Sequence, residues 1–496
     1  MSNNHTNSET LSHGRDLLNK DLHYLAIDQA ESVLEKEPEN KDAMLLKGDV
    51  FFKANDYLNA AETYDELTRL APDNAEYVER AANASMAGGA QEKALRHAKT
   101  FQKLTKGWPG SVLMLSNIYE RTGQTELAWE VLHSVPLGEE FLEGVANVAP
   151  RLLMQEKKYG EAIDTLRKFL DWAQTNVKNP EAPDGIVVEA WFMLAKAYDR
   201  LGEYDQSWEA AQTAHDISDV SWIPEQQEQR SREIREFMSH ELIRALAHSS
   251  EDHEEPVFIV GNPRSGTSLL EQILSMHPEV ENAGELAASS KIIHQCPVTI
   301  DSFNTYPNCL VDMREEDANA MARKYMNATS WIDSNPRRIT NKSLSLHNQA
   351  GFLSLILPKS RMIMLHRHPL DNCISCYTTN LVGSKHNYTK QLDWLAAMWI
   401  ERHKMQEYWM QTLEVPMLEL HYDRMVVDQE NETRRLLDFL DLQWVDGCME
   451  FHKSKRVAAT ISYDQVNQKM YTSSSGRWKN YEKHIGPLID ALGEYI

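Results

Sequence analysis

The sequence is poor in the features that mark secreted, membrane-spanning or disulfide-stabilised proteins. Only five of its 496 residues are cysteine, and all five lie after residue 290, which excludes a disulfide framework for so long a chain. The longest nearly apolar run, residues 351–358, is far too short to span a bilayer. The opening residues, MSNNHTNSET, contain neither the basic nor the apolar segment of a signal peptide. These absences predict a soluble, cytoplasmic protein without a membrane span.

Positive charge is also scarce, above all in the first half. The formal net charge is −23, and residues 1–255 contain 26 Lys and Arg against 46 Asp and Glu. Residues 256–496 contain 25 against 28. Sequence-independent binding of nucleic acid requires a basic surface, so we expect no nucleic-acid partner. The contrast between the halves predicts two modules with different surfaces.

The sequence contains almost no residues spaced like the ligands of a metal site. Cys373 and Cys376 are spaced C-x-x-C, but no second pair with suitable spacing accompanies them. His366 and His368 flank Arg367. Neighbouring side chains of a strand point to opposite faces, so these two histidines would point away from Arg367. We therefore expect no metal and interpret these two histidines as structural.

What the first half does contain is a repeat with a period near 34 residues. The clearest copy begins at Gly48 and continues with Phe51, Ala60, Tyr64 and Pro72. Small residues recur at corresponding places in the other copies: Ala26, Ala30, Ala82, Ala94, Ala128, Ala162, Ala195 and Ala211. This half resembles tetratricopeptide repeat proteins. The resemblance implies an α solenoid arm over residues 15–218, in which small residues let neighbouring helices cross closely.

The role of this arm is left open by the repeat pattern. Such solenoids commonly bind peptides on their concave face, so a peptide or protein partner is one expectation. Alternatively, the arm only braces the second half or forms a homodimer. Residues 219–254, which are rich in Glu, Gln, Arg and His, are expected to form a polar helical connector.

The second half opens with a strand, a glycine-rich turn and a helix. The apolar run 256–260 predicts the strand, and apolar residues recur at helical spacing from Leu269 onward. This geometry aims backbone N–H groups and a helix N-terminus at a phosphate. The expected phosphate contacts are Arg264, Ser265, Gly266, Thr267 and Ser268.

The turn nearly fits the Walker pattern of nucleoside triphosphatases. Position 267 is Thr, however, where that pattern requires Lys. Without this lysine the loop would poorly hold a β- or γ-phosphate with Mg²⁺. A P-loop kinase is therefore kept only as an alternative.

The run PRSGTSLLEQILSMHPEV, followed by GEL, resembles the 5′-phosphosulfate-binding segment of sulfotransferases, especially the tyrosylprotein type and its bacterial relatives with tetratricopeptide arms. Arg367 and Ser375, after an expected strand at 361–366, resemble the 3′-phosphate site of that family. Residues 475–480, SGRWKN, are similar to its late loop over the nucleotide. The resemblance implies a P-loop-like α/β three-layer domain with a parallel sheet over residues 255–496. It also implies 3′-phosphoadenosine-5′-phosphosulfate as sulfuryl donor and 3′,5′-ADP as product.

The same resemblance implies roles for individual residues. Glu285 takes the place of the catalytic base, Lys342 that of a lysine acting on the transferring group, and Arg264 acts on the donor side. Small-molecule sulfotransferases carry a histidine base two residues after a lysine. Here Leu344 stands at that position and His347 is out of register, which speaks against that arrangement.

Further nucleotide contacts are expected later in the chain, at Tyr422, Arg477 and Lys479. The tyrosylprotein type has a serine two residues before its late tryptophan, where this chain has Gly476. Ser474 or Ser475 is expected to substitute for it.

The motifs do not identify the acceptor, which is expected to be a hydroxyl of a protein or peptide tyrosine or of a small molecule. A nucleotide-binding scaffold that has lost activity is the second alternative. The presence of the whole set of candidate residues favours an active sulfotransferase.

Overall fold

The structure is a computed structural model that describes residues 2–54, 56–136, 138, 142–176, 185–332, 334–382, 386–454 and 469–496. The chain forms two compact units, Met1–Thr175 and Asn176–Ile496. In the described part of the chain, none of the helices combines the length and the apolar character that crossing a bilayer requires.

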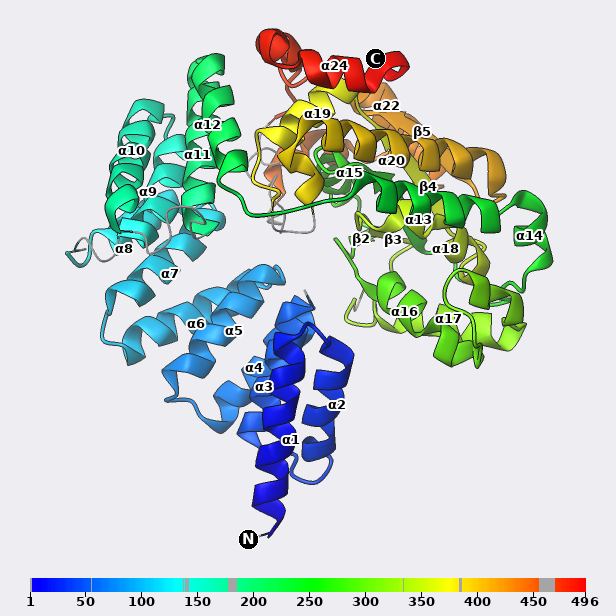
Figure 1. The fold of residues 1–496 in the computed structure, drawn as a ribbon, viewed down its shortest axis with the longest axis horizontal. Helices are drawn as coiled ribbons and strands as arrows, with labels where there is room; N and C mark the ends of the chain where they lie inside the picture. Colours follow the sequence, from blue (N-terminus) through cyan, green and yellow to red (C-terminus); the bar gives the residue numbers. More distant parts are fainter. Residues whose placement is uncertain are drawn as a thin grey trace. The chain divides into compact units, whose positions relative to one another are not determined.

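The first unit is an array of helices, and each helix between Ser2 and Gln155 packs on the next (Figure 1). Its helices are α1 Ser2–Asn19, α2 His23–Leu34, α3 Lys41–Lys53, α4 Tyr57–Leu70, α5 Ala75–Ala87, α6 Gln91–Leu104, α7 Pro109–Arg121, α8 Thr125–Leu132, α9 Leu142–Gln155 and α10 Tyr159–Asn176.

Local sequence explains where these helices begin and how closely they pack. The side chain of Asn40 accepts a hydrogen bond from the Ala43 amide at 3.0 Å and so caps α3. A Cβ atom at Gly48 would lie 2.5 Å from Tyr64 Cε1, so α3 and α4 approach closely because position 48 has no side chain. The alanines of the repeat pattern, including Ala60 and Ala128, are fully buried. The predicted tetratricopeptide-like solenoid is confirmed.

The second unit begins with the last helix pair of the repeat pattern. This pair is α11 Gly185–Leu201 and α12 Tyr204–Asp216. Two helices follow in the expected connector, α13 Pro224–Phe237 and α14 His240–Ala245. Met238 and Ile243 are buried in a core that these helices share with the sheet. The sequence places the end of the repeat arm at residue 218 and the end of the connector at residue 254, and these domain limits stay a prediction.

A five-stranded sheet forms the centre of the second unit. Its strands are β1 Pro256–Gly261, β2 Val280–Asn282, β3 Arg338–Asn341, β4 Arg361–His366 and β5 Met417–His421. They are ordered β2-β3-β1-β4-β5, and every neighbouring pair is parallel. In the register of the central pair, Ile259 lies opposite Ile363.

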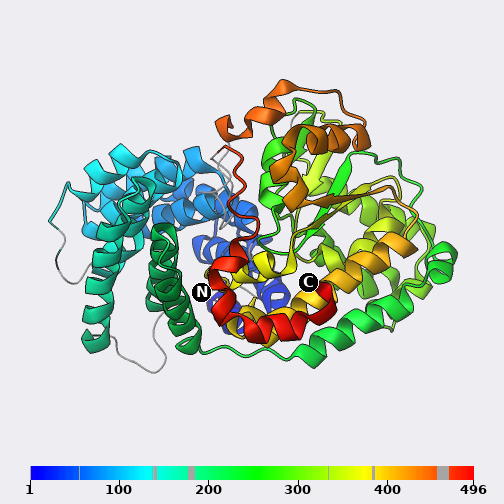
Figure 2. The same ribbon diagram turned by 90° about the horizontal axis from the view of Figure 1, so that it is seen from above.

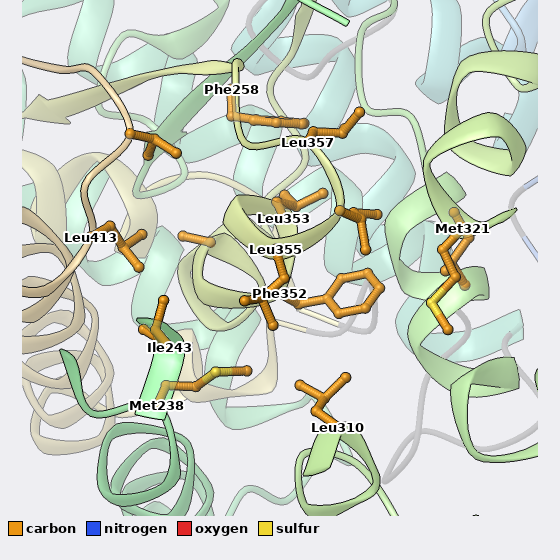
Figure 3. Close-up of a cluster of buried hydrophobic side chains, with 14 of the residues drawn as sticks. Met238, Ile243, Phe258, Leu310, Met321, Phe352, Leu353, Leu355, Leu357 and Leu413 are labelled. Carbon is orange, nitrogen blue, oxygen red and sulfur yellow. The ribbon is translucent and has the colours of Figure 1, made fainter. Parts of the chain in front are cut away.

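Helices cover both faces of this sheet, and the side chains of β1 alternate between two cores. Phe258 and Val260 join one core with residues of α13, α16, α17, α18 and α20, as the close-up shows for Phe258, Leu353 and Met238 (Figure 3). Val257 and Ile259 join the other core with residues of α15 and α22. A strand buried on both faces must be apolar throughout, which is why the run 256–260 lacks polar residues. The predicted three-layer α/β domain with a parallel sheet is confirmed.

The remaining elements surround this framework, and α24 packs alongside α20 (Figure 2). The α-helices are α15 Thr267–Leu274, α16 Ala288–Ile300, α17 Glu315–Asn327, α18 Ala350–Ile356, α19 Pro369–Tyr377, α20 Leu392–Thr412, α21 Tyr422–Val427, α22 Gln429–Phe439 and α24 Gly486–Leu492. The 3₁₀ helices are η2 Asn308–Asp312, η3 Leu346–Asn348, η4 Asn387–Lys390, η5 Asp446–Lys453, η6 Arg477–His484 and η7 Gly493–Tyr495.

Because the sheet is parallel, all five strands end at one edge. In open α/β sheets, ligands bind outside the carboxyl ends of the strands. The segments that follow the strands therefore meet where a ligand is expected.

A buried histidine of α12 should make the stability of the protein depend on pH. His215 is buried, its Nε2 atom lies 2.8 Å from the Tyr377 carbonyl oxygen, and burial lowers its pKa from 6.5 to about 4. As pH falls below 6.5, the unfolded chain takes up a proton at His215 before the folded chain does, and stability is lost down to about pH 4. We expect this histidine to remove about 2 kcal/mol of unfolding free energy between pH 7.5 and 5.

The measurement compares thermal unfolding of the wild type and His215→Gln over this pH range. Glutamine can still donate to the Tyr377 carbonyl but does not titrate. The variant should lose less stability on acidification than the wild type. Parallel pH curves for the two proteins would contradict the account.

Candidate functional site

The loop between β1 and α15 is built as a phosphate-binding turn. Ser265 Oγ donates to the Asn262 carbonyl oxygen at 2.7 Å and closes the turn. Gly266 has φ +103°, and a Cβ atom there would lie 2.5 Å from Tyr422 Cδ2. Arg264 also has positive φ, +64°, which is uncommon for a residue other than glycine and is concentrated at functional sites. Thr267 and Ser268 form the first turn of α15, where backbone N–H groups lack helical partners.

Arg367, directly after β4, connects this loop to a segment near the C-terminus. Its Nη1 atom donates to the Arg264 carbonyl oxygen at 2.6 Å, and its Nη2 atom donates to the Ser474 carbonyl oxygen at 2.8 Å. Its guanidinium carbon lies 4.8 Å from the centre of the Tyr422 ring. Ser375, in α19, accepts a hydrogen bond from Arg264 Nε at 3.1 Å. The structure therefore brings together the two segments that the sequence related to the 5′- and 3′-phosphate sites.

The late segment 474–478 is held against the loop by two carboxylates that sequence reasoning missed. Asp371 accepts from the amides of Gly476 at 2.6 Å and Trp478 at 2.8 Å. Asp423 accepts from Ser475 Oγ at 2.7 Å and from the His368 amide at 2.8 Å. Tyr422 Oη lies 2.5 Å from Ser474 Oγ. Both serines that were expected to replace the missing late-loop serine thus contact residues that follow β5.

Two expected nucleotide contacts at the end of this segment, Arg477 and Lys479, lie in different surroundings. Arg477 forms an ion pair with Asp199 of α11, and its Nε atom lies 3.2 Å from Asp199 Oδ1. Lys479 is exposed, with its amino group 6.0 Å from the centre of the Trp478 ring.

Lys342 and Glu285 form an ion pair after β3 and β2. Lys342 Nζ donates to Glu285 Oε1 at 2.8 Å, and the Lys342 side chain is 2% exposed whereas that of Glu285 is 51% exposed. The Lys342 amide also donates to the Gly284 carbonyl oxygen at 2.9 Å. The pair is therefore fixed on the lysine side and open to solvent on the carboxylate side.

The turn that carries Glu285 is positioned by a buried carboxylate of α15. Glu271, 4% exposed, accepts from the Gly284 amide at 3.1 Å, and its carbonyl oxygen accepts from Asn282 Nδ2 at 3.0 Å. Sequence reasoning had no signal for this role, because Glu271 reads as an ordinary helical glutamate four residues after Thr267.

The candidate residues fit an anionic ligand. Arg367 Nε is buried and has no hydrogen-bond partner among the described residues. Buried donors are nearly always satisfied, so an unsatisfied guanidinium donor beside a phosphate-type loop indicates a missing acceptor. A bound phosphate would supply one, and a guanidinium binds phosphate well.

The cysteines fit a structural role. All five are buried free thiols, and burial raises the pKa of Cys376 to about 11. Cys376 Sγ lies 3.3 Å from the Pro263 carbonyl oxygen, so it packs beneath the loop. Within the described ranges, no cluster of three or more His, Cys, Asp or Glu side chains is arranged to hold a metal ion.

Comparison with protein families agrees with this architecture. Residues 256–446 match the model of the sulfotransferase family. Residues 11–75, 51–111 and 188–217 match models of the tetratricopeptide repeat. The chain therefore contains tetratricopeptide repeats and a sulfotransferase-family domain.

Individual relatives are distant. An uncharacterized protein of Aquifex aeolicus (strain VF5) is 25% identical over 486 residues, which cover 94% of this chain and 62% of that protein. Protein-tyrosine sulfotransferase A of Caenorhabditis elegans is 25% identical over 237 residues, which cover 46% of this chain and 60% of the relative. The chain thus spans about three fifths of the length of these two relatives. Among solved structures, the sulfotransferase domain of the Synechococcus PCC 7002 olefin synthase is similar at 16% identity with a TM-score of 0.34, covering 48% of this chain and 89% of that domain.

Gly266 allows a direct test of how the loop is built. Gly266→Ala places a side chain at positive φ and against Tyr422, whereas Gly202→Ala places one at positive φ with no atom within 4 Å. We expect the control, Gly202→Ala, to lower the free energy of unfolding by about 1 kcal/mol through backbone strain. Gly266→Ala should lower it by about twice as much or more, because the clash with Tyr422 adds to the strain. Thermal unfolding of both variants measures the difference. Equal losses would show that Tyr422 does not constrain the loop.

Proposed function

We propose that this chain is a sulfotransferase that uses 3′-phosphoadenosine-5′-phosphosulfate as donor and a hydroxyl as acceptor. One observation carries the proposal: a candidate residue follows every strand of the sheet at its carboxyl edge. The loop residues follow β1, Glu285 follows β2, Lys342 follows β3, Arg367 follows β4 and Tyr422 follows β5.

The proposed nucleotide contacts divide between the two phosphates. The 5′-phosphosulfate would meet Arg264, the turn residues Ser265 and Gly266, and the first turn of α15 with Thr267 and Ser268. The 3′-phosphate would meet Arg367 and Ser375. The hydrogen bond between Arg264 and Ser375 supports a single nucleotide site, because it brings a residue of each set into contact. Tyr422 and Lys479 are proposed as further contacts in the same region.

The proposed chemistry rests on Lys342, Arg264 and Glu285. When bound, the donor supplies an activated sulfuryl group, and its transfer to the acceptor oxygen leaves 3′,5′-ADP. Lys342 and Arg264 would stabilise the negative charge that grows on the leaving phosphate oxygen. Glu285 would take the proton of the acceptor hydroxyl, which the exposure of its carboxylate supports. No metal is required by this arrangement, because the cationic side chains supply the charge.

The two alternatives are less well supported. A P-loop kinase would need a lysine where this chain has Thr267. A scaffold that has lost activity would not need the whole set of candidate residues, which this chain contains.

The repeat arm supports a further part of the proposal. Tetratricopeptide repeats typically bind peptides or proteins, and residues 11–111 match their family model. We propose that this part of the chain binds a peptide or protein. The acceptor itself is proposed only as a hydroxyl, of a tyrosine or of a small molecule.

Nucleotide selectivity tests the proposed donor. In a thermal-shift panel, 3′,5′-ADP should stabilise the protein by mass action, whereas ATP with Mg²⁺ should not. Ser375→Ala should weaken 3′,5′-ADP binding about fivefold, because one hydrogen bond to the nucleotide is lost. The same variant should bind adenosine 5′-phosphate nearly as well as the wild type. Ser354→Ala is the control, because the Ser354 hydroxyl donates to Gly351 within α18.

Two results would count against this proposal. Stabilisation by ATP with Mg²⁺ but not by 3′,5′-ADP would favour the kinase alternative. Equal effects of Ser375→Ala on both nucleotides would remove Ser375 from the 3′-phosphate site.

Glu285 is tested by catalysis. Glu285→Gln should lower kcat by about 10²- to 10⁴-fold, since it removes the base, while the affinity for 3′,5′-ADP should change little. The assay is release of 3′,5′-ADP with a panel of tyrosyl peptides, phenols, sugars and alcohols. Glu281→Gln is the matched control, because Glu281 lies in β2 and accepts from Ser334 Oγ. An unchanged rate in Glu285→Gln would rule out Glu285 as the base.

A further inference from the structure

The helix pair α11–α12 packs on α19 and on η6, the 3₁₀ helix that begins at Arg477 in the late segment. Trp208 of α12 is 5% exposed and stacks on Tyr377 of α19, with ring centroids 4.6 Å apart and planes at 22°. It also stacks on His484 of η6, with centroids 5.3 Å apart and planes at 8°. These contacts lie within one compact unit, so the pair is part of the same body as the sheet.

A partly buried polar cluster also joins the helix pair to η6. Asp199 of α11 accepts hydrogen bonds from Arg477 and from Tyr481 Oη, the latter at 2.7 Å. Ser207 Oγ lies 3.1 Å from Tyr481 Oη, and it must be the donor because the tyrosine hydrogen is used toward Asp199. The side chains of Asp199 and Arg477 are only 14% and 24% exposed. An ion pair so shielded fixes geometry more firmly than an exposed one.

Arg477 occupies a special position in the late segment. The amides on either side of it, those of Gly476 and Trp478, both donate to Asp371 of α19. The backbone of this stretch is thus held by Asp371 of α19, and the side chain of Arg477 is held by Asp199 of α11. Ser474, three residues earlier, accepts from Arg367, the proposed 3′-phosphate residue.

We propose that Asp199, in the last helix pair of the repeat pattern, is a positioning residue for nucleotide binding. Through Arg477 it holds the late segment against Arg367, so that the 3′-phosphate site is ordered before the nucleotide arrives. A preordered loop loses less conformational freedom on binding, which increases affinity. This inference rests on the proposed function. It also gives Arg477 an indirect role in place of the direct nucleotide contact that the sequence suggested.

A second ion pair at the same contact provides a matched control. Asp205 of α12 pairs with Lys483 and, at 2.9 Å, with His484 Nε2. Asp205 is 47% exposed and Lys483 is 62% exposed, and both partners lie beyond the stretch 474–478. Removing this pair should therefore disturb the same helix contact without moving the late segment.

The experiment measures the affinities of full-length Asp199→Asn, Tyr481→Phe and Asp205→Asn for 3′,5′-ADP and adenosine 5′-phosphate by calorimetry. We expect Asp199→Asn to weaken 3′,5′-ADP binding about tenfold and adenosine 5′-phosphate binding less than about twofold. Tyr481→Phe should change the ratio in the same direction by a smaller factor. Asp205→Asn should leave both affinities as in the wild type.

The ratio of the two affinities separates positioning from simple destabilisation. Equal losses for both nucleotides in Asp199→Asn, or no loss for either, would overturn the inference, because Asp199 would then only stabilise the fold. A wild-type protein that failed to bind 3′,5′-ADP would overturn the proposed function itself, and this inference with it. That result is seen before any variant is measured, so the two failures are distinguishable.

Discussion

The hydrogen bonds of Arg367 connect three parts of the chain that are far apart in the sequence. From the end of β4, this one guanidinium donates to the carbonyl of Arg264 in the loop after β1 and to the carbonyl of Ser474 in the late segment. The parallel sheet makes this geometry available, because β1 and β4 are neighbours and end at the same edge. The third nitrogen of the guanidinium, Nε, has no partner among the described residues. A phosphate bound there would complete the coordination of a side chain that already organises the site.

Much of this arrangement could be predicted from local sequence, since local rules govern it. The apolar run 256–260, Gly266 and the helical spacing after it predict a strand, a turn and a helix, and the structure has all three. The alternating requirements of two cores explain why residues 257–260 of β1 and 362–365 of β4 are all apolar. The small residues of the repeat predict close helix crossings, as at Gly48.

Other parts of the candidate site depend on tertiary contacts that no local pattern shows. Asp371 contacts amides more than a hundred residues later, and Asp199 contacts a side chain still further along the chain. Each reads in sequence as an ordinary helical carboxylate. Glu271 is hidden in the same way, because its partners lie in the turn after β2. Periodicity likewise assigns α11 and α12 to the repeats but says nothing about the outer surface of α12, where Trp208 packs on α19.

We propose that the segments after the five strands form one site for a nucleotide with a 3′-phosphate. A crystal structure of the full-length protein with 3′,5′-ADP tests it most directly. We expect the 3′-phosphate within hydrogen-bond distance of Arg367 and Ser375, and the 5′-phosphate against the first turn of α15. A nucleotide bound in the opposite orientation, or away from the carboxyl edge of the sheet, would contradict it.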